Sequence, residues 1–342
     1  MSDEKPLIVP VFIPNQGCPH RCVFCDQEKI TSQPAGPIHG RRVRELLELA
    51  RRSTSFYARK NREIAFYGGT FASLPEEKIR ELLGVVAPYL QEGIFHSVRV
   101  STRPDSIDEG KVKFLKSLGV STVEVGTQSM DDEVLGRTRR GHTALDTQRA
   151  VDLLRQHGLG VGIQLMPGLP GDSAKRFSAT VQQVIRMKPD MVRLYPVVVI
   201  RGTELAQWLE SGAYHPLSLE EAVRICAESC LRLEEAGIPV IRIGLMTSEC
   251  LREKGQVLGG PWHESFGHLV RSELYHRKIE ALLPRPDEAE KIFIRIPSKE
   301  IALFRGHRNA GIRRVEKMTN ALIEGILPDD SLPPGRIKVE TR

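Results

Sequence analysis

Three cysteines lie within eight residues of one another near the start of the chain: Cys18, Cys22 and Cys25. They occupy one short loop directly after an apolar run, residues 7–13, which is predicted to be a strand. Three thiolates at this spacing can bind three irons of a cubane [4Fe–4S] cluster, for which ferredoxins supply a fourth cysteine. The next cysteine here is Cys226, about two hundred residues further on. One iron is therefore left open to an exogenous ligand.

A structural zinc site is the alternative use of these thiols. Such a site needs four ligands, commonly in two paired clusters, and His20 or His39 could supply the fourth. The sequence contains no second paired half. The tight spacing on a loop after a strand favours the iron–sulfur interpretation. Phe24, just before Cys25, is then expected to shield the cluster and pack against its ligand.

The composition of the 342-residue chain is that of a soluble globular protein, with 40% hydrophobic and 27% charged residues. This length allows one large α/β barrel with an appendage, or two domains. No apolar run is long enough to cross a membrane, and the segment Met1–Pro6 lacks the features of a signal peptide. A cytoplasmic location is therefore predicted, where thiols stay reduced. The net charge of +6 suits an RNA or another anionic substrate.

Strands and helices are predicted to alternate through the first two thirds of the chain. The predicted strands are 7–13, 63–67, 98–102, 122–126, 160–166 and 190–200, and the helices between them include 40–53, 75–90, 107–118 and 144–157. Six such units indicate an α/β fold with a parallel sheet. The unusual residues follow the carboxyl ends of the strands, where β/α barrels build active sites. A doubly wound sheet would carry a glycine fingerprint where the cysteines stand.

The cysteine pattern with one open iron is the signature of the radical S-adenosylmethionine (SAM) enzymes, which this chain resembles. The resemblance implies a partial (β/α)6 barrel of the TIM type. It also implies a [4Fe–4S] cluster, SAM as cosubstrate and an electron donor of the flavodoxin or ferredoxin kind. The implied reaction is reductive cleavage of SAM to a 5′-deoxyadenosyl radical, which abstracts hydrogen from a substrate.

The same resemblance implies where SAM is bound. The turn after the second strand, Gly68-Gly69-Thr70, corresponds to the place where the family binds the methionine amino group, and two glycines let a ligand approach the backbone. Read alone, this turn is an ordinary glycine turn. The later strands end in further candidate SAM contacts at the barrel mouth: Thr102, Gln128, Gln164 and Met166. The Pro/Gly-rich segment 166–172 is expected to lie against the adenine.

An arginine before the helix 144–157 is the candidate partner of the SAM carboxylate, because a guanidinium forms charge-assisted hydrogen bonds with such a group. We predict Arg140 for this role in preference to Arg139 and Arg137. The alternative is a solvated basic turn with no ligand.

Five short sequence motifs together resemble those of the bacterial relatives of the catalytic subunit of Elongator, which modifies wobble uridines of tRNA. They are Asn15–Pro19, Gly68–Phe71, Thr102–Asp105, Arg140–Thr143 and Met166–Gly171, and the resemblance covers about residues 7–270. Oxygen-independent coproporphyrinogen oxidase is a more distant relative. Only 72 residues follow Val270, too few for the acetyltransferase domain of the Elongator subunit. The resemblance suggests tRNA, and neither DNA nor a membrane, as the partner, but it leaves the product open.

Residues 276–342 are predicted to form a small α+β unit after a barrel domain of residues 1–275. A strand (292–296), a helix (298–304), the turn Gly306–Asn309 and a second helix (311–318) follow one another, and a further strand or two come after them. This is the order of a KH module, whose G-x-x-G turn clamps RNA backbone. The second glycine is missing here, but the surroundings are basic: Arg305, Arg308, Arg313, Arg314 and Lys317. The alternative is a helical lid with a solvated basic face.

Some functional alternatives stay open. Cys226, Cys230 and Cys250 could form a second metal site, but Cys226 and Cys230 fall on one apolar helical stripe, which indicates core packing. The substrate of a radical enzyme could be a small molecule, as for the porphyrinogen relatives. A protein that binds RNA through an iron–sulfur or zinc site without catalysis is a third interpretation.

Overall fold

The computed structural model describes residues 6–34 and 36–341. Residues 1–5, most of the segment from which the absence of a signal peptide was predicted, lie outside this range. The chain divides into a larger unit, residues up to Leu217 with Leu233–Trp262, and a smaller unit, Ser218–Arg232 with residues from His263 onward. The boundary predicted after residue 275 falls inside the continuous helix α12 (Phe266–Ile279). No helix in the described ranges is long and apolar enough to cross a membrane.

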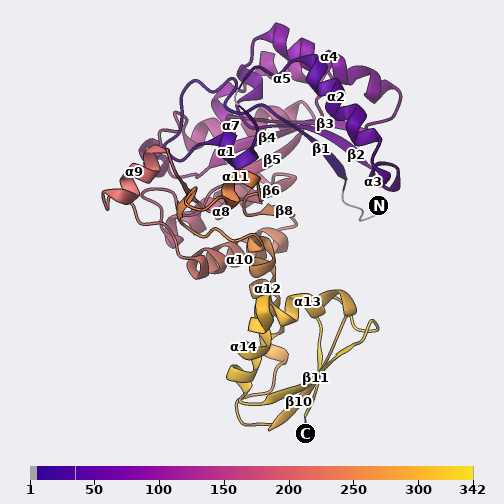
Figure 1. The fold of residues 1–342 in the computed structure, drawn as a ribbon, viewed down its shortest axis with the longest axis vertical. Coiled ribbons are helices and arrows are strands. Elements are labelled where there is room, and N and C mark those ends of the chain that lie inside the picture. Colours follow the sequence, from indigo (N-terminus) through magenta and orange to yellow (C-terminus); the bar gives the residue numbers. More distant parts are fainter. Residues whose placement is uncertain (1–5, 35, 342) are drawn as a thin grey trace. The chain divides into compact units, whose positions relative to one another are not determined.

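The larger unit is built on a seven-stranded, all-parallel sheet of order β1-β2-β3-β4-β5-β6-β8 (Figure 1). The strands are β1 (Leu7–Phe12), β2 (Arg62–Tyr67), β3 (Ser97–Thr102), β4 (Thr122–Gln128), β5 (Gly160–Leu165), β6 (Met191–Leu194) and β8 (Val240–Ile243). Tyr67 of β2 receives a hydrogen bond from Arg193 of β6, four places away in the sheet. Only a curled sheet allows this contact, and the predicted partial barrel is confirmed.

Helices connect the strands and cover the outer face of the sheet. They are α1 (Gln27–Thr31), α2 (Gly40–Arg51), α3 (Thr54–Ala58), α4 (Glu76–Gln91), α5 (Glu109–Ser117), α6 (Asp132–Arg137), α7 (Ala144–Gln156), α8 (Ala174–Met187), α9 (Glu204–Glu210) and α11 (Glu249–Arg252), while α10 (Leu219–Glu235) has residues in both units. Along β2, Ile64 and Phe66 are fully buried on one face. Glu63 and Tyr67 alternate with them and face the inside of the curl, as the period of a strand requires.

Two parts of the larger unit differ from the sequence prediction. The predicted strand 190–200 is two strands, because Pro196 lacks the N–H that a central strand needs. Its second part, β7 (Val199–Ile200), pairs antiparallel with β9 (Val257–Gly259) in a separate small sheet. The second difference is the pairing of β8, which lies beside β6 as a seventh strand of the main sheet, whereas six strands were predicted for it. That long-range pairing has no local signal in the sequence.

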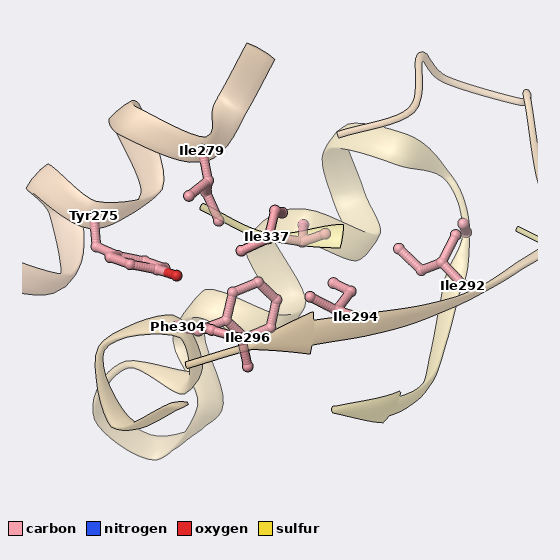
Figure 2. Packing of buried hydrophobic residues seen from close by; sticks show 9 residues of the cluster. Tyr275, Ile279, Ile292, Ile294, Ile296, Phe304 and Ile337 are labelled. Atoms are coloured by element: carbon pink, nitrogen blue, oxygen red, sulfur yellow. The ribbon is translucent and has the colours of Figure 1, made fainter. Parts of the chain in front are cut away.

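The smaller unit has a three-stranded sheet of order β11-β10-β12. The central strand β10 (Lys291–Ile296) runs parallel to β11 (Leu322–Pro328) and antiparallel to β12 (Lys338–Thr341). Two helices, α13 (Ile301–Arg305) and α14 (Ala310–Thr319), connect β10 to β11. Figure 2 shows the core, in which Ile292, Ile294 and Ile296 of β10 belong to one buried cluster and Ile296 lies beside Phe304. The predicted order of strand, helix, turn, helix and strand is therefore present.

Candidate active site

The three cysteines of the 18–25 loop each have a neighbour from a different part of the larger unit. The Cys18 sulfur lies 3.3 Å from the Thr70 hydroxyl, after β2. Arg140, between α6 and α7, donates from Nη1 to the Cys22 sulfur at 3.0 Å. Cys25 lies 3.8 Å from the side-chain oxygen of Asn15, at the start of the loop. The fold therefore positions all three thiols through contacts with the carboxyl-terminal edge of the sheet.

The cysteine loop and the glycine turn after β2 are locked together through their backbones. The side-chain oxygen of Gln27 accepts hydrogen bonds from the N–H groups of Asn15 (2.6 Å) and Gly69 (2.7 Å). A Cβ on Gly69 would lie 2.2 Å from the Gln16 carbonyl oxygen, and one on Gly17 would lie 2.3 Å from that of Thr70. Both glycines also have positive φ. We conclude that Gly69 is required for this close approach of the two loops.

Burial controls the protonation of two of the thiols. It raises the pKa of Cys25 to about 12, with the neighbouring Cys22 and Cys18 adding to the effect. Burial also raises the pKa of Cys18, although the hydrogen bond with Thr70 opposes it. Metal ligands must be thiolates, so iron binding displaces these protons. Within residues 6–34 and 36–341, no three potential ligands converge on a single ion; a cubane does not need this, because each thiolate binds a different iron.

The residues around Gly126 fit a polar ligand. Arg140 donates from Nη2 to the Gly126 carbonyl at 2.6 Å, and a Cβ on Gly126 would lie 3.0 Å from the Gln128 amide nitrogen. Arg140 and Gln128 are each only 7% exposed, yet Arg140 Nε and Gln128 Oε1 have no hydrogen-bond partner among the described residues. Buried polar atoms are nearly always paired. An unpaired donor and an unpaired acceptor beside the cysteines suit a ligand with both carboxylate and amino groups, as SAM has.

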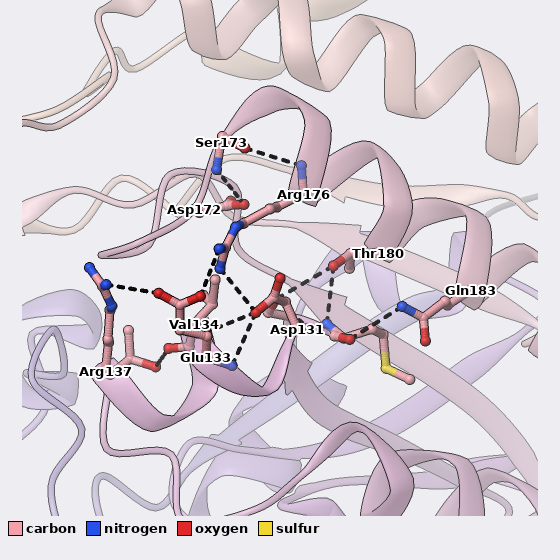
Figure 3. A network of polar contacts seen from close by, with 12 residues as sticks. Asp131, Glu133, Val134, Arg137, Asp172, Ser173, Arg176, Thr180 and Gln183 are labelled. Atoms are coloured by element: carbon pink, nitrogen blue, oxygen red, sulfur yellow. Dashed lines mark hydrogen bonds and ion pairs between the residues drawn. The ribbon is translucent and has the colours of Figure 1, made fainter.

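Arg140 differs clearly from the two arginines near it. Arg137 pairs with Glu133 at 2.8 Å, in the network of ion pairs on the outside of α6 and α8 (Figure 3). Arg139 is exposed and pairs with Glu204 at 2.7 Å. Only Arg140 of the three is buried and contacts a cysteine. Its assignment as the SAM contact remains a prediction.

The other predicted SAM contacts have different surroundings. Thr102 is buried and hydrogen-bonds the Ala72 N–H (3.3 Å) and the Ser106 hydroxyl (2.7 Å), which joins β3 to the segment after β2. Phe24 and Met166 pack against the same apolar cluster, beside Leu169. Gln164 lies on the inner face of the sheet and donates to Glu124 at 2.9 Å. These contacts leave their predicted roles untested.

The Pro/Gly-rich segment after β5 lines a cavity of about 570 Å³ in the larger unit. Gly168–Asp172 forms one wall, and Trp208 and Tyr214 contribute aromatic side chains. The Tyr214 hydroxyl donates to the Gly168 carbonyl at 2.5 Å and fixes the segment. Contact of this segment with adenine stays a prediction.

Sequence reasoning missed a second anchor of the cysteine loop. Arg103 binds Asp105 through two hydrogen bonds, of 2.9 and 2.8 Å, and its remaining terminal nitrogen lies 3.1 Å from His20 Nε2. A Cβ on Gly141 would lie 2.6 Å from the same imidazole. His20 is therefore held between Arg103 and Gly141. Arg103 lies in the motif Thr102–Asp105, which the sequence analysis singled out. Nothing in that motif indicated that Arg103 contacts the cysteine loop.

His142 gives a testable pH dependence. Burial, with the nearby charge of Arg140, lowers the pKa of His142 to about 3 from 6.5. The folded protein therefore binds fewer protons than the unfolded chain below pH 6.5, and stability falls as the pH falls towards 3. Between pH 7.5 and pH 5 we expect a loss of about 2 kcal/mol from this residue. Urea unfolding of His142→Gln should show a smaller loss than the wild type by this amount; equal losses would mean that folded His142 takes up the proton.

A curled parallel sheet with three cysteines on the loop after its first strand defines a radical SAM enzyme. Residues 12–184, just over half of the chain, match the family model of the radical SAM superfamily, and residues 189–276 match its radical SAM C-terminal domain. The chain belongs to this superfamily and is an enzyme of this class. Members of the superfamily use a [4Fe–4S] cluster and SAM.

Within the superfamily, several relatives carry the name tRNA uridine(34) acetyltransferase. The chain is 40% identical over 129 residues to a tRNA uridine(34) acetyltransferase of Methanocaldococcus jannaschii, which is 37% of this chain and 24% of that protein. It is 30% identical over 230 residues to the enzyme of the same name from Dehalococcoides mccartyi, covering 58% of this chain and 50% of that protein. The chain therefore matches half or less of the length of these relatives.

A solved structure has the same fold. The archaeal Methanocaldococcus infernus Elp3 superposes with a TM-score of 0.59 over 81% of this chain and 63% of that chain, at 24% sequence identity. At this identity the similarity shows the fold alone. With the sequence relatives, it confirms the predicted resemblance to the Elongator catalytic subunit.

Proposed function

We propose that this protein binds a [4Fe–4S] cluster through Cys18, Cys22 and Cys25, and SAM beside it, and that it modifies uridine-containing tRNA. Held by these three thiolates, the cluster would supply one electron for reductive cleavage of SAM to methionine and a 5′-deoxyadenosyl radical, and that radical would take a hydrogen atom from the substrate. The observation that carries the proposal is Arg140, a buried guanidinium with one nitrogen on the Cys22 sulfur and another left unpaired. This residue fits a ligand that lies against the cluster.

The protein's own residues have mainly positioning roles in this proposal. Gln27 and Gly69 hold the cysteine loop against the turn after β2. Arg140 and Gln128 offer a buried donor and a buried acceptor to the amino-acid part of SAM. Burial of these groups excludes water from the reacting centre. The electron comes from an external donor, for which we propose a flavodoxin or ferredoxin, and a cytoplasmic location follows from that partner.

The proposal of tRNA as the substrate depends on the relatives and on charge. Two relatives are named for acetylation of uridine 34 of tRNA, but the short match leaves the acetyl-transfer step outside the proposal. The chain has a net charge of +6, which favours a polyanionic partner.

The turn between α13 and α14 supports an RNA-binding role for the smaller unit. In Gly306–Asn309, both Arg308 and Asn309 have positive φ. Asn309 stands where a G-x-x-G turn has its second glycine, and asparagine is one of the few other residues that readily adopts this conformation. Arg305, Arg308, Arg313 and Lys317 are exposed around the turn, whereas Arg314 pairs with Glu273. A basic surface at a turn whose fourth position holds an asparagine of positive φ in place of glycine supports RNA binding by this unit.

A stimulation assay tests the proposed function. After anaerobic reconstitution, the protein would receive dithionite, SAM and an unmodified anticodon stem-loop with uridine at the wobble position. We expect this RNA to accelerate release of 5′-deoxyadenosine several-fold, because bound substrate consumes the radical and draws cleavage forward. The control is the same stem-loop with cytidine at that position, which should not stimulate.

The outcomes separate the open alternatives. Cleavage of SAM without any effect of RNA would favour a small-molecule substrate. Binding of RNA by a protein with full iron content that releases no 5′-deoxyadenosine would favour a role without catalysis.

A further inference from the structure

The inner face of the curled sheet carries one buried charge on each of four strands. Glu63 (β2), Arg99 (β3) and Glu124 (β4) are at most 5% exposed. Arg99 binds Glu63 at 2.6 Å and Glu124 at 2.8 Å, and Arg193 (β6) binds Glu124 at 2.9 Å. Two carboxylates therefore balance two guanidinium groups, and this network has no net charge.

Arg193 extends the network to two tyrosines near the carboxyl-terminal edge. Its Nη1 donates to the Tyr195 hydroxyl at 3.0 Å, and its Nη2 donates to the Tyr67 hydroxyl. The guanidinium also lies over the Tyr67 ring, 4.8 Å from its centroid. We call Tyr67, Arg193 and Tyr195 the tyrosine arch, because it joins strands β2 and β6 across the curl.

Both phenols of the arch are left as hydrogen-bond donors. Each oxygen already accepts from Arg193, and neither hydroxyl donates to a protein acceptor within the described part of the chain. Burial raises the pKa of both Tyr67 and Tyr195, so the two O–H groups stay protonated at neutral pH. Both residues are nevertheless only partly buried. Two oriented donors with nothing to donate to are suited to a ligand with oxygen acceptors.

The arch adjoins the proposed radical site. Tyr67 directly precedes Gly68-Gly69-Thr70, whose Thr70 hydroxyl contacts the Cys18 sulfur. The Tyr195 N–H donates to the Leu165 carbonyl at 2.8 Å, next to Met166. A substrate group held by the arch would therefore lie over the inside of the barrel, near the edge that carries the cysteines.

We propose that the hydroxyls of Tyr67 and Tyr195 bind the ring carbonyl oxygens of an uncharged pyrimidine, that of a uridine. The inference rests on the proposed function and assigns its base-binding residues. The balanced network offers a charged group no partner of its own, because its two carboxylates and two guanidinium groups are already paired. Uracil presents two carbonyl acceptors, whereas cytosine replaces one with an amino donor. A donor facing a donor leaves both unpaired, which is the basis of discrimination against the wrong substrate.

The test uses the full reconstituted protein and the two stem-loops described above. Tyr67→Phe, Tyr195→Phe and the double variant keep the rings and remove the donors. We expect the uridine stem-loop concentration for half-maximal stimulation to rise about ten-fold per lost hydroxyl, the effect of one good hydrogen bond, and the preference for uridine over cytidine to fall. A matched control is Tyr89→Phe on α4, whose hydroxyl donates to Glu48 at 2.7 Å. It should behave as the wild type.

Each outcome decides the inference. If the double variant has full iron content and the wild-type urea midpoint but keeps the wild-type half-saturation and uridine preference, the arch does not bind the base and the proposed function stands. If the double variant does not fold, the single variants decide: wild-type half-saturation and wild-type uridine preference in both of them would also contradict the inference. If the wild type is not stimulated by the uridine stem-loop at all, the proposed function fails and the assignment of a uracil site fails with it.

Discussion

Cys22→Ala is expected to abolish release of 5′-deoxyadenosine. Two cysteines on the loop cannot hold a cubane cluster that has only three protein ligands, and Arg140 also loses the sulfur on which it lies. Iron content after anaerobic reconstitution should fall together with SAM cleavage. The measurement is 5′-deoxyadenosine by chromatography, with iron and sulfide analysis on the same samples.

Cys250→Ala is the matched control for this variant. Cys250 lies in α11 of the same unit, and its hydrogen bond with Ser32 uses the backbone N–H, which alanine keeps. Iron content and SAM cleavage should equal those of the wild type. A Cys22→Ala protein with full iron and full cleavage would show that Cys22 is not a ligand.

Arg99→Met is expected to cost about 3–5 kcal/mol of unfolding free energy, the usual effect of removing one partner of a buried ion pair. Methionine fills a similar volume but leaves Glu63 buried without its cation, whereas Glu124 keeps Arg193. Urea unfolding at neutral pH measures the loss.

Two further variants sharpen this prediction. Adding Glu63→Gln to Arg99→Met should recover part of the loss, because the stranded carboxylate becomes neutral. Lys113→Met, which breaks the exposed pair with Glu109, should leave the urea midpoint unchanged. A loss for Arg99→Met as small as that of Lys113→Met would mean that the inner network does not hold its charges in the way that the contacts indicate.

Local patterns predicted most of the elements. The helix predicted at 40–53 is α2 (Gly40–Arg51), and Val43 and Leu47 form its buried side. Helix α8 was not predicted, although Ser173 is an N-cap and Phe177, Val181 and Val184 recur on one face. The position of β8 beside β6 could not be predicted, because pairing between distant strands leaves no local pattern.

For the site, the sequence located the side chains that lie in recognisable motifs. Cys18, Cys22, Cys25 and Arg140 are near one another, as the motifs suggested. The role of Gln27 was not visible, because it depends on how two loops meet. The inner network did leave a signal, since Arg193 is the one charged residue of β6 and Glu63 directly precedes the apolar residues of β2. The sequence does not show that these two charges belong to one network, because β2 and β6 approach each other only through the curl of the sheet.

The interlocked loops have a consequence for repair after the cluster is lost. Gly17 and Gly69 allow the cysteine loop to pack closely against the turn after β2. The side chain of Gln27 joins the two by hydrogen bonds, which need no metal. We therefore expect the thiols to keep their places in the protein without iron. We expect the apoprotein to keep its cluster-binding site preformed. The rate of cluster reconstitution should then depend on the supply of iron and sulfide and not on refolding.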